Sequence, residues 1–204
     1  RRRRDPVLEL LWYDPAVEPV EPTGRMALGR AYEAHGACIS SRADWDPRST
    51  PSVVYSKGGH GREGHGHHDA GQVCVEGYGE RLIVDLGSPS NYPADFFSEN
   101  RWKYYNAGAW GHNVPVFGGR EMSCREEDRA GVLGAEFEEE RGGWWTIDTT
   151  ALYGGARRVR RTVVHLLPEV VAVVDRGCSR CCPRPVAQAA VGGTPVAVAP
   201  RVGT

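Results

Sequence analysis

The sequence predicts an all-β protein, built as an antiparallel β-sandwich with a short helical remnant at its N-terminus. Many short segments alternate apolar and polar residues, as half-buried strands do. The 26 glycines and 14 prolines indicate many turns, and helical patterns are scarce beyond the first dozen residues. With 204 residues, 40% of them hydrophobic, the chain can bury the core of one such domain.

The first predicted element is a helix at residues 8–13. Residues 15–24 follow it, and the prolines at positions 15, 19 and 22 predict an extended linker. We therefore expect two parts in the chain. Residues 1–24 form a helical remnant and linker, and residues 25–204 form the β-sandwich domain.

Strand-like segments fill the rest of the chain, with turn residues at their ends. In chain order they are residues 37–41, 52–57, 72–76, 81–86, 113–117, 131–138, 144–150, 157–166, 170–175 and 186–191. Residues 77–80 predict the turn of a tight hairpin. Pro168 and Glu169 separate two apolar runs that we expect to pair as neighbouring strands.

The densest group of chemically active side chains lies at residues 65–69, with three histidines and an aspartate. Imidazole is the commonest metal ligand, and it titrates near neutral pH, so this segment is suited to metal binding or proton transfer. If the segment is extended, His65, His67 and Asp69 share one face. His68 then lies on the opposite face and should tolerate replacement.

Two later residues complete a candidate metal site. Asp85 follows the second half of the predicted hairpin, and His112 opens another strand-like run. A ligand set of His67, Asp85 and His112 suits Zn²⁺, which binds nitrogen and carboxylate oxygen at about 2.0 to 2.2 Å and usually takes four ligands. The fourth ligand would be water or another side chain. The alternative is a polar, Gly-rich loop whose histidines only make hydrogen bonds, since H-x-H is a weak signal.

Several motifs, in their order and spacing, resemble those of the heparinase II/III-like polysaccharide lyases, in particular their C-terminal β-sandwich region. The motifs lie at residues 11–15, 41–45, 64–71, 84–88, 111–114, 145–148 and 173–176. The resemblance implies a supersandwich-like β domain. It also implies that His65 lies at the catalytic centre and that His67, Asp85 and His112 bind zinc.

The reaction implied by this resemblance is β-elimination at a uronic acid. The substrate carboxylate is neutralised, a base removes the C5 proton, and an acid protonates the departing glycosidic oxygen. Each proton transfer needs a group within about 3 Å of its target. The expected partner is an acidic polysaccharide or oligosaccharide, and the resemblance implies a periplasmic or secreted location.

Complete lyases of this family carry a large N-terminal helical toroid that contributes a catalytic tyrosine and one wall of the cleft. We expect this chain to be a fragment without that toroid, and to be inactive alone. Tyr92, Tyr104 and Tyr105 are the nearby phenols. Tyr104 and Tyr105 are catalytic candidates and Tyr92 is a substrate-binding candidate, although packing or sugar stacking is an alternative role for each.

Charge excludes some partners. A formal net charge of −1 and a pI near 6.7 argue against a nucleic-acid or anionic-membrane binder. The basic run at residues 157–161 is expected to pair with the acidic run at 136–140 on a solvated face. Arg42 and Arg101 are candidates for holding an acidic glycan in a groove. The sequence has no apolar run of membrane-spanning length, and we assign no function to the cysteines at 178, 181 and 182.

Two other functions stay open at this point. The chain could be a stand-alone carbohydrate-binding or structural module in which zinc stiffens the loops. In that case sugar rings would stack on exposed aromatic side chains, namely Trp102, Tyr104, Tyr105 and Trp110. A cupin-like metalloenzyme is weaker, because its iron chemistry prefers two histidines and one carboxylate with open positions, although the ligand count here allows it.

Overall fold

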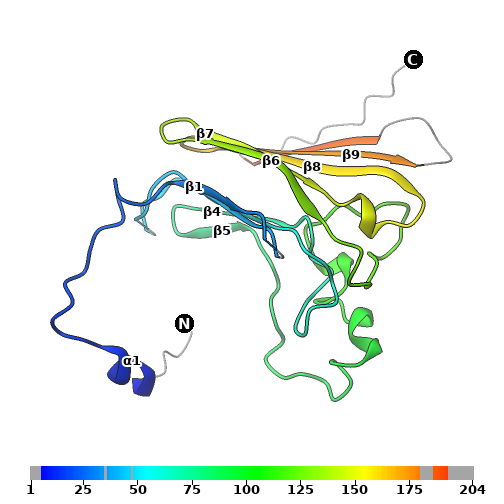
Figure 1. Ribbon diagram of the computed structural model, residues 1–204, viewed down its shortest axis with the longest axis horizontal. Coiled ribbons are helices and arrows are strands. Elements are labelled where there is room, and N and C mark those ends of the chain that lie inside the picture. Colours follow the sequence, from blue (N-terminus) through cyan, green and yellow to red (C-terminus); the bar gives the residue numbers. More distant parts are fainter. Residues whose placement is uncertain (1–5, 35, 47, 180–185, 193–204) are drawn as a thin grey trace.

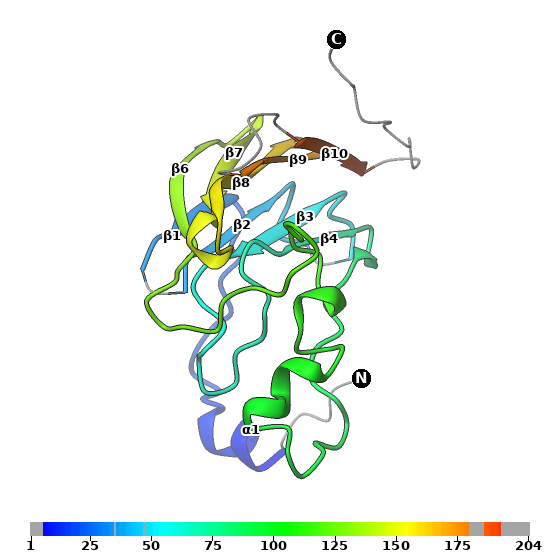
Figure 2. The same cartoon turned by 90° about the vertical axis from the view of Figure 1, so that its right-hand side faces the viewer.

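Two antiparallel sheets lie face to face in the computed structural model, which describes residues 6–34, 36–46, 48–179 and 186–192 (Figure 1, Figure 2). The first sheet has the order β1 (Gly29–Tyr32), β2 (Cys38–Arg42), β3 (Val53–Lys57), β4 (Val73–Gly77), β5 (Glu80–Ile83). The second has the order β10 (Val186–Gly192), β9 (Val170–Ser179), β8 (Ala156–Leu166), β7 (Gly142–Asp148), β6 (Gly131–Glu138). The predicted antiparallel β-sandwich is confirmed.

Strands that are consecutive in the chain are neighbours in both sheets, and each pairing between them is antiparallel. A meander of this kind differs from the Greek-key strand order of a cupin jelly roll. The fold therefore does not favour the cupin-like alternative.

The core lies between the sheets because inward side chains of each strand alternate with outward ones. Ile39 and Val54 of the first sheet belong to the same buried cluster as Trp145 and Val163 of the second. Trp145 is fully buried, and its indole Nε1 donates a hydrogen bond to Ser56 Oγ at 3.0 Å. This bond satisfies the one polar atom of the largest core side chain and links the two sheets.

The predicted hairpin turn is confirmed between β4 and β5. Tyr78 and Gly79 have φ values of +52° and +77°. Positive φ at both central positions is the conformation of a type I′ turn, whose twist matches that of the flanking strands. Glycine adopts it without strain at position 79.

The strand predictions are confirmed with shifts of one to a few residues at their ends, except in two places. The sequence analysis missed β1, and its predicted strand at 113–117 is wrong. The backbone there bonds to side chains instead of a neighbouring strand. Arg161 donates to the carbonyl oxygen of Asn113, and Tyr153 donates to that of Pro115.

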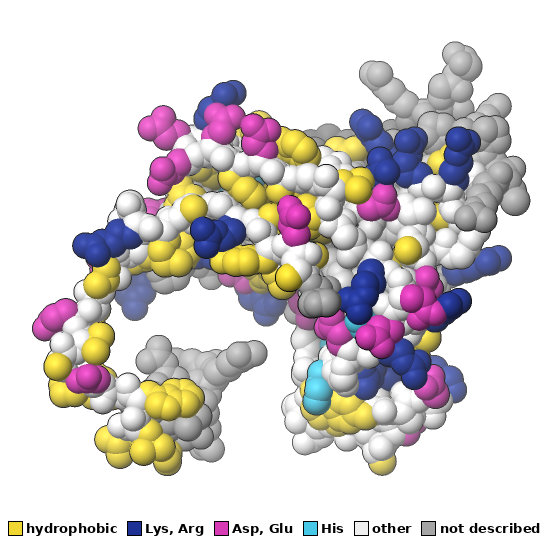
Figure 3. All heavy atoms as spheres, viewed as in Figure 1, with side chains coloured by type: hydrophobic (Ala, Val, Ile, Leu, Met, Phe, Trp, Pro, Cys, Tyr) yellow, Lys and Arg dark blue, Asp and Glu magenta, His cyan; other side chains and the backbone are white. Residues whose placement is uncertain are grey.

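The predicted helix is confirmed as α1 (Pro6–Trp12), which stands apart from the sheets (Figure 1). Hydrophobic side chains gather on it and on the segment that follows, and the surface is hollowed beside them (Figure 3). The described residues also contain three short 3₁₀ helices, η1 (Glu99–Lys103), η2 (Ala109–Gly111) and η3 (Thr150–Leu152). None of the helices described here is long and apolar enough to cross a bilayer. The domain boundary after residue 24 stays a prediction, and Cys181 and Cys182 lie outside the described residues.

A buried polar cluster joins the two sheets. His165 of β8 is 0% exposed, and its ring nitrogens lie 2.8 Å from Ser41 Oγ and 2.7 Å from Ser52 Oγ. Ser52 donates its hydroxyl hydrogen to the carbonyl oxygen of Pro168. The Nε2–H of His165 therefore donates to Ser52. Burial keeps the ring neutral by lowering its pKa, so Nδ1 accepts from Ser41.

We expect the folded protein to lose stability in mild acid because of His165. Burial lowers the pKa of this ring to about 4, whereas in the unfolded chain it is near 6.5. Between these values the unfolded state binds more protons, so stability is full above about pH 6.5 and is lost as the pH falls towards 4. The expected loss is about 2 kcal/mol between pH 7 and pH 5.

Urea unfolding at the two pH values measures this loss. A variant with His165→Asn, which cannot titrate, should lose correspondingly less stability over the same interval. Equal losses in the variant and the natural sequence would contradict the assignment to His165.

Candidate functional site

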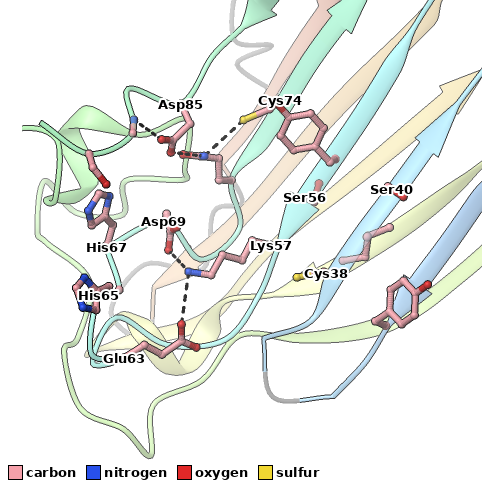
Figure 4. Close-up of a pocket in the computed structure, with 17 residues that line it drawn as sticks. Cys38, Ser40, Ser56, Lys57, Glu63, His65, His67, Asp69, Cys74 and Asp85 are labelled. Atoms are coloured by element: carbon pink, nitrogen blue, oxygen red, sulfur yellow. Dashed lines mark hydrogen bonds and ion pairs between the residues drawn. The ribbon is translucent and has the colours of Figure 1, made fainter. Parts of the chain in front are cut away.

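The candidate site lies where two long loops meet the outer face of the first sheet (Figure 4). One loop, residues 58–72, connects β3 to β4, and the other, residues 84–130, connects β5 to β6. A pocket of about 640 Å³ is lined by side chains of β1 to β4 and by both loops. His65, His67, Asp69 and Asp85 are among its lining residues.

The alternation predicted for residues 65–69 holds, although this segment is a loop and not a strand. His65, His67 and Asp69 line the pocket, whereas His68 turns into the protein and is 2% exposed. The ring of His68 stacks on Trp102 with centroids 4.1 Å apart. The expected tolerance of His68 to replacement does not fit this packing.

A second buried histidine lies beside the pocket. The side chain of His112 is 0% exposed, and its Nδ1 lies 2.8 Å from Gln72 Oε1 and 3.0 Å from Asp85 Oδ2. Both neighbours accept hydrogen bonds, so the ring carries its proton on Nδ1. Its Nε2 is buried and has no hydrogen-bond partner. An unpartnered nitrogen of this kind is a candidate metal donor.

The three predicted metal ligands come together. The rings of His67 and His112 have centroids 5.2 Å apart, and Asp85 hydrogen-bonds to His112. The hydrogen bond from His112 holds the pKa of Asp85 well below its usual value, so this side chain is a carboxylate at neutral pH. Burial, and then the charge of His112, lower the pKa of His67, which favours its neutral, ligating form.

Two of the three residues, Asp85 and His112, belong to a hydrogen-bonded network with Gln72. Gln72 Nε2 donates to Asp85 Oδ2 at 2.6 Å, on the oxygen that also accepts from His112. Within the described residues, no group of three or more His, Cys, Asp or Glu side chains is arranged to hold a metal ion. Zinc binding at this site is therefore a proposal, and it must be compatible with these hydrogen bonds.

A lysine that the sequence analysis missed supplies positive charge in the pocket. Lys57 Nζ lies 2.7 Å from Asp69 Oδ1 and 3.9 Å from Glu63 Oε2 (Figure 4). Lys57 ends β3, and the alternation of that strand turns it outward together with Tyr55. This periodicity is visible in the sequence, but it does not reveal which loop covers the outer face.

The phenols at the pocket are not those expected from the sequence. Tyr104 donates to Asp95 Oδ1 at 2.5 Å, and this bond raises the pKa of Tyr104. Tyr104 and Tyr105 do not line the pocket that contains His65. Tyr32 and Tyr55 line it instead.

An aromatic surface adjoins His65. The ring of Phe97 meets that of His65 edge-on, with centroids 5.0 Å apart, and Tyr92 packs on Phe97 at 4.9 Å. Tyr92 is 43% exposed and Phe97 is 49% exposed. The two rings therefore offer an apolar surface next to the imidazole of His65. The sequence analysis named only Tyr92 of the two.

The two arginines expected to bind substrate occupy different settings. Arg101 is buried and donates to the carbonyl oxygens of Glu63, Gly64 and Gly66, so it clamps the loop that carries His65. The guanidinium of Arg42 lies 4.1 Å from the ring centre of Trp45, in a smaller hollow farther along the same sheet. Both hollows include Tyr55, so they are adjoining parts of one surface.

A comparison with known families identifies the family of this chain. A family model described as Heparinase II/III-like, C-terminal matches residues 50–179, which is more than half of the chain. The chain belongs to this family. The matched segment runs from just before β3 to the end of β9 and includes both loops of the site. A search of curated proteins found no match.

Proposed function

We propose that this chain is the β domain of a polysaccharide lyase that cleaves uronic-acid-containing glycans by β-elimination. The observation that carries the proposal is the placement of His65 and His67 in one pocket beside Lys57, inside the segment matched by the Heparinase II/III-like family. An exposed imidazole, a cation and a sugar-sized cavity are the parts that such a reaction uses.

His65 is the proposed proton-transfer residue. The C5 hydrogen of a uronate is removed as a proton, its electron pair forms the C4–C5 double bond, and the C4–oxygen bond breaks. The departing oxygen then takes a proton. A positioned imidazole performs one of these transfers, and we propose that a second group, on the opposite side of the sugar, performs the other.

Charge and aromatic surface support an acidic sugar as the ligand. Lys57 faces the pocket and would draw a uronate carboxylate towards His65, and Arg42 would contact an acidic unit farther along the sheet. Tyr92 and Phe97 would stack on the apolar face of a sugar ring. Arg101 acts in this proposal by holding the loop, since its guanidinium binds three backbone carbonyls.

The opposite wall of the cleft would come from a helical domain of the same protein. His65 and Phe97 are exposed and form one open side of a binding surface. A second wall would exclude water and bring the partner acid or base. Because such glycans are polymers found outside cells, we propose that the protein works in the periplasm or is secreted.

We also propose that His67, Asp85 and His112 hold Zn²⁺. The trio fits the ion in two respects. His112 has a buried ring nitrogen without a partner, and its hydrogen bond to Asp85 fixes the tautomer that leaves this nitrogen free to bind a metal. A zinc ion bound there would join the two loops and hold the pocket in shape.

Metal analysis of the protein, purified without chelator, tests the zinc site. We expect about one zinc per chain, as one site of this type holds one ion. His67→Ala and His112→Ala should abolish the binding, whereas His65→Ala should leave it intact. Removing zinc with a chelator should lower stability by several kcal/mol. Zinc-free protein, or unchanged zinc in both variants, would eliminate the site.

Incubation of the complete protein with uronate-containing glycans tests the lyase reaction. Its product carries a C4–C5 double bond, whose ultraviolet absorbance reports each cleavage. The second candidate function, a carbohydrate-binding module, is favoured by the exposed rings of Tyr92 and Phe97. Glycan binding without any unsaturated product would support that module and contradict the lyase.

A further inference from the structure

One buried arginine of the second sheet touches both loops of the site. Arg161 lies on β8 and is 5% exposed. Its Nε and Nη2 donate to the two carboxylate oxygens of Asp175 on β9, each at 2.7 Å. This two-point pair fixes the plane of the guanidinium and compensates its charge inside the protein.

The remaining nitrogen of Arg161 bonds to the backbone of the site loops. Nη1 donates to the carbonyl oxygen of Gly71 at 2.8 Å and to that of Asn113 at 2.5 Å. Gly71 lies two residues after Asp69, in the loop that carries His67. Asn113 is the residue after His112. One planar group, held by the second sheet, therefore bridges the two loops that carry the histidines.

The end of the first loop is also held against the second sheet. Gly71 has a φ of +89°, and a Cβ added there would lie 3.0 Å from the side chain of Thr149, which is fully buried. The loop carbonyl thus faces Arg161 from a backbone position that only glycine adopts easily. Packing inside the protein therefore fixes the contact between Gly71 and Arg161.

We propose that Arg161 is a positioning residue that sets the separation of His67 and His112. Its effect on metal binding and catalysis rests on the function proposed above, whereas its effect on the distance between the two rings does not. Lysine cannot replace it, because an ammonium group lacks the planar fork that serves Asp175 and both carbonyls together.

The experiment compares Arg161→Lys with Arg160→Lys in metal-free protein. Arg160 is the matched control, since it lies next in the same strand and pairs with Asp148 at 2.9 Å, but is 41% exposed. In the natural sequence, the rings of His67 and His112 should show a nuclear Overhauser effect. We expect Arg161→Lys to abolish it while circular dichroism stays unchanged, and Arg160→Lys to retain it.

A second variant covers the case in which lysine prevents folding. Arg161→Met combined with Asp175→Leu removes both charges, and replacing a buried ion pair by apolar side chains is often tolerated. This variant should also lose the Overhauser effect. A folded Arg161→Lys or double variant that keeps it would overturn the proposal.

Zinc affinity provides a separate readout. If the zinc site holds, the Arg161 variants should bind zinc at least about tenfold more weakly than the Arg160 control, the usual cost of losing a group that supports the ligands. Natural protein that binds no zinc but shows the Overhauser effect would refute the metal site alone. Unchanged zinc affinity in a folded Arg161 variant would refute the positioning role.

Discussion

In the proposed lyase, replacement of His65 by alanine is expected to lower turnover by about 10²-fold or more. Loss of a general acid or base has an effect of this size. The fold should be unaffected, because His65 is exposed and its ring packs against the partly exposed Phe97. Steady-state kinetics on a uronate-containing glycan measure the change, and metal analysis should find the zinc content intact.

Tyrosine variants provide the comparison for His65→Ala. Tyr104→Phe removes a hydroxyl that is bonded to Asp95 and does not line the pocket, so it should reduce turnover much less. The same expectation holds for Tyr105→Phe. If either tyrosine variant loses as much turnover as His65→Ala, that tyrosine is a catalytic residue after all. A normal rate in His65→Ala would show that His65 is not catalytic.

The 204 residues by themselves are expected to cleave glycans at least about 10⁵-fold more slowly than a protein that also carries the proposed helical domain. Holding the sugar between two catalytic groups supplies roughly 7 to 11 kcal/mol of the barrier, and each 1.36 kcal/mol corresponds to about a factor of ten in rate. An open pocket on the outer face of one sheet leaves the substrate free to turn. The unsaturated product, followed at equal molar concentrations of the two proteins, gives the ratio.

Two observations would bear on this second prediction. Addition of the separately produced helical domain should restore part of the rate, because it returns the opposite wall. Enzyme-like rates from the 204 residues alone would contradict the two-wall arrangement. Tyr55 and Tyr32, the phenols that line the pocket, would then be the candidates for the second proton transfer.

The sequence was sufficient for the fold and for the face of the histidine loop, because both follow from local alternation. Buried positions alternate with more exposed ones along β3, along most of β8 and at the start of β9, and the same rule separates His67 from His68. The strand predicted at residues 113–117 is wrong for a reason that lies elsewhere in the chain. That segment has a strand-like composition, but its carbonyls bond to Arg161 and Tyr153, which lie about forty residues further along the chain.

Long-range placement accounts for the rest of what the sequence could not predict. The basic run at 157–161 was expected to pair with 136–140 on a solvated face, but β7 lies between β6 and β8. Arg160 pairs with Asp148 of β7 instead, and Arg161 turns inward to Asp175. Strand order decides which partner each of these adjacent arginines meets, and no local pattern contains that order.

The inward face of β8 carries Arg161 and His165, and so ties the site to strand registry. Because side chains alternate along a strand, a slip of one residue would turn both groups to solvent and bring Arg160 and Val164 into the core. The carbonyls of Gly71 and Asn113 would then lose their shared donor. The pocket on the first sheet therefore depends on correct strand registry in the second sheet. A protein in which β8 pairs in the wrong register would fold with a disrupted pocket.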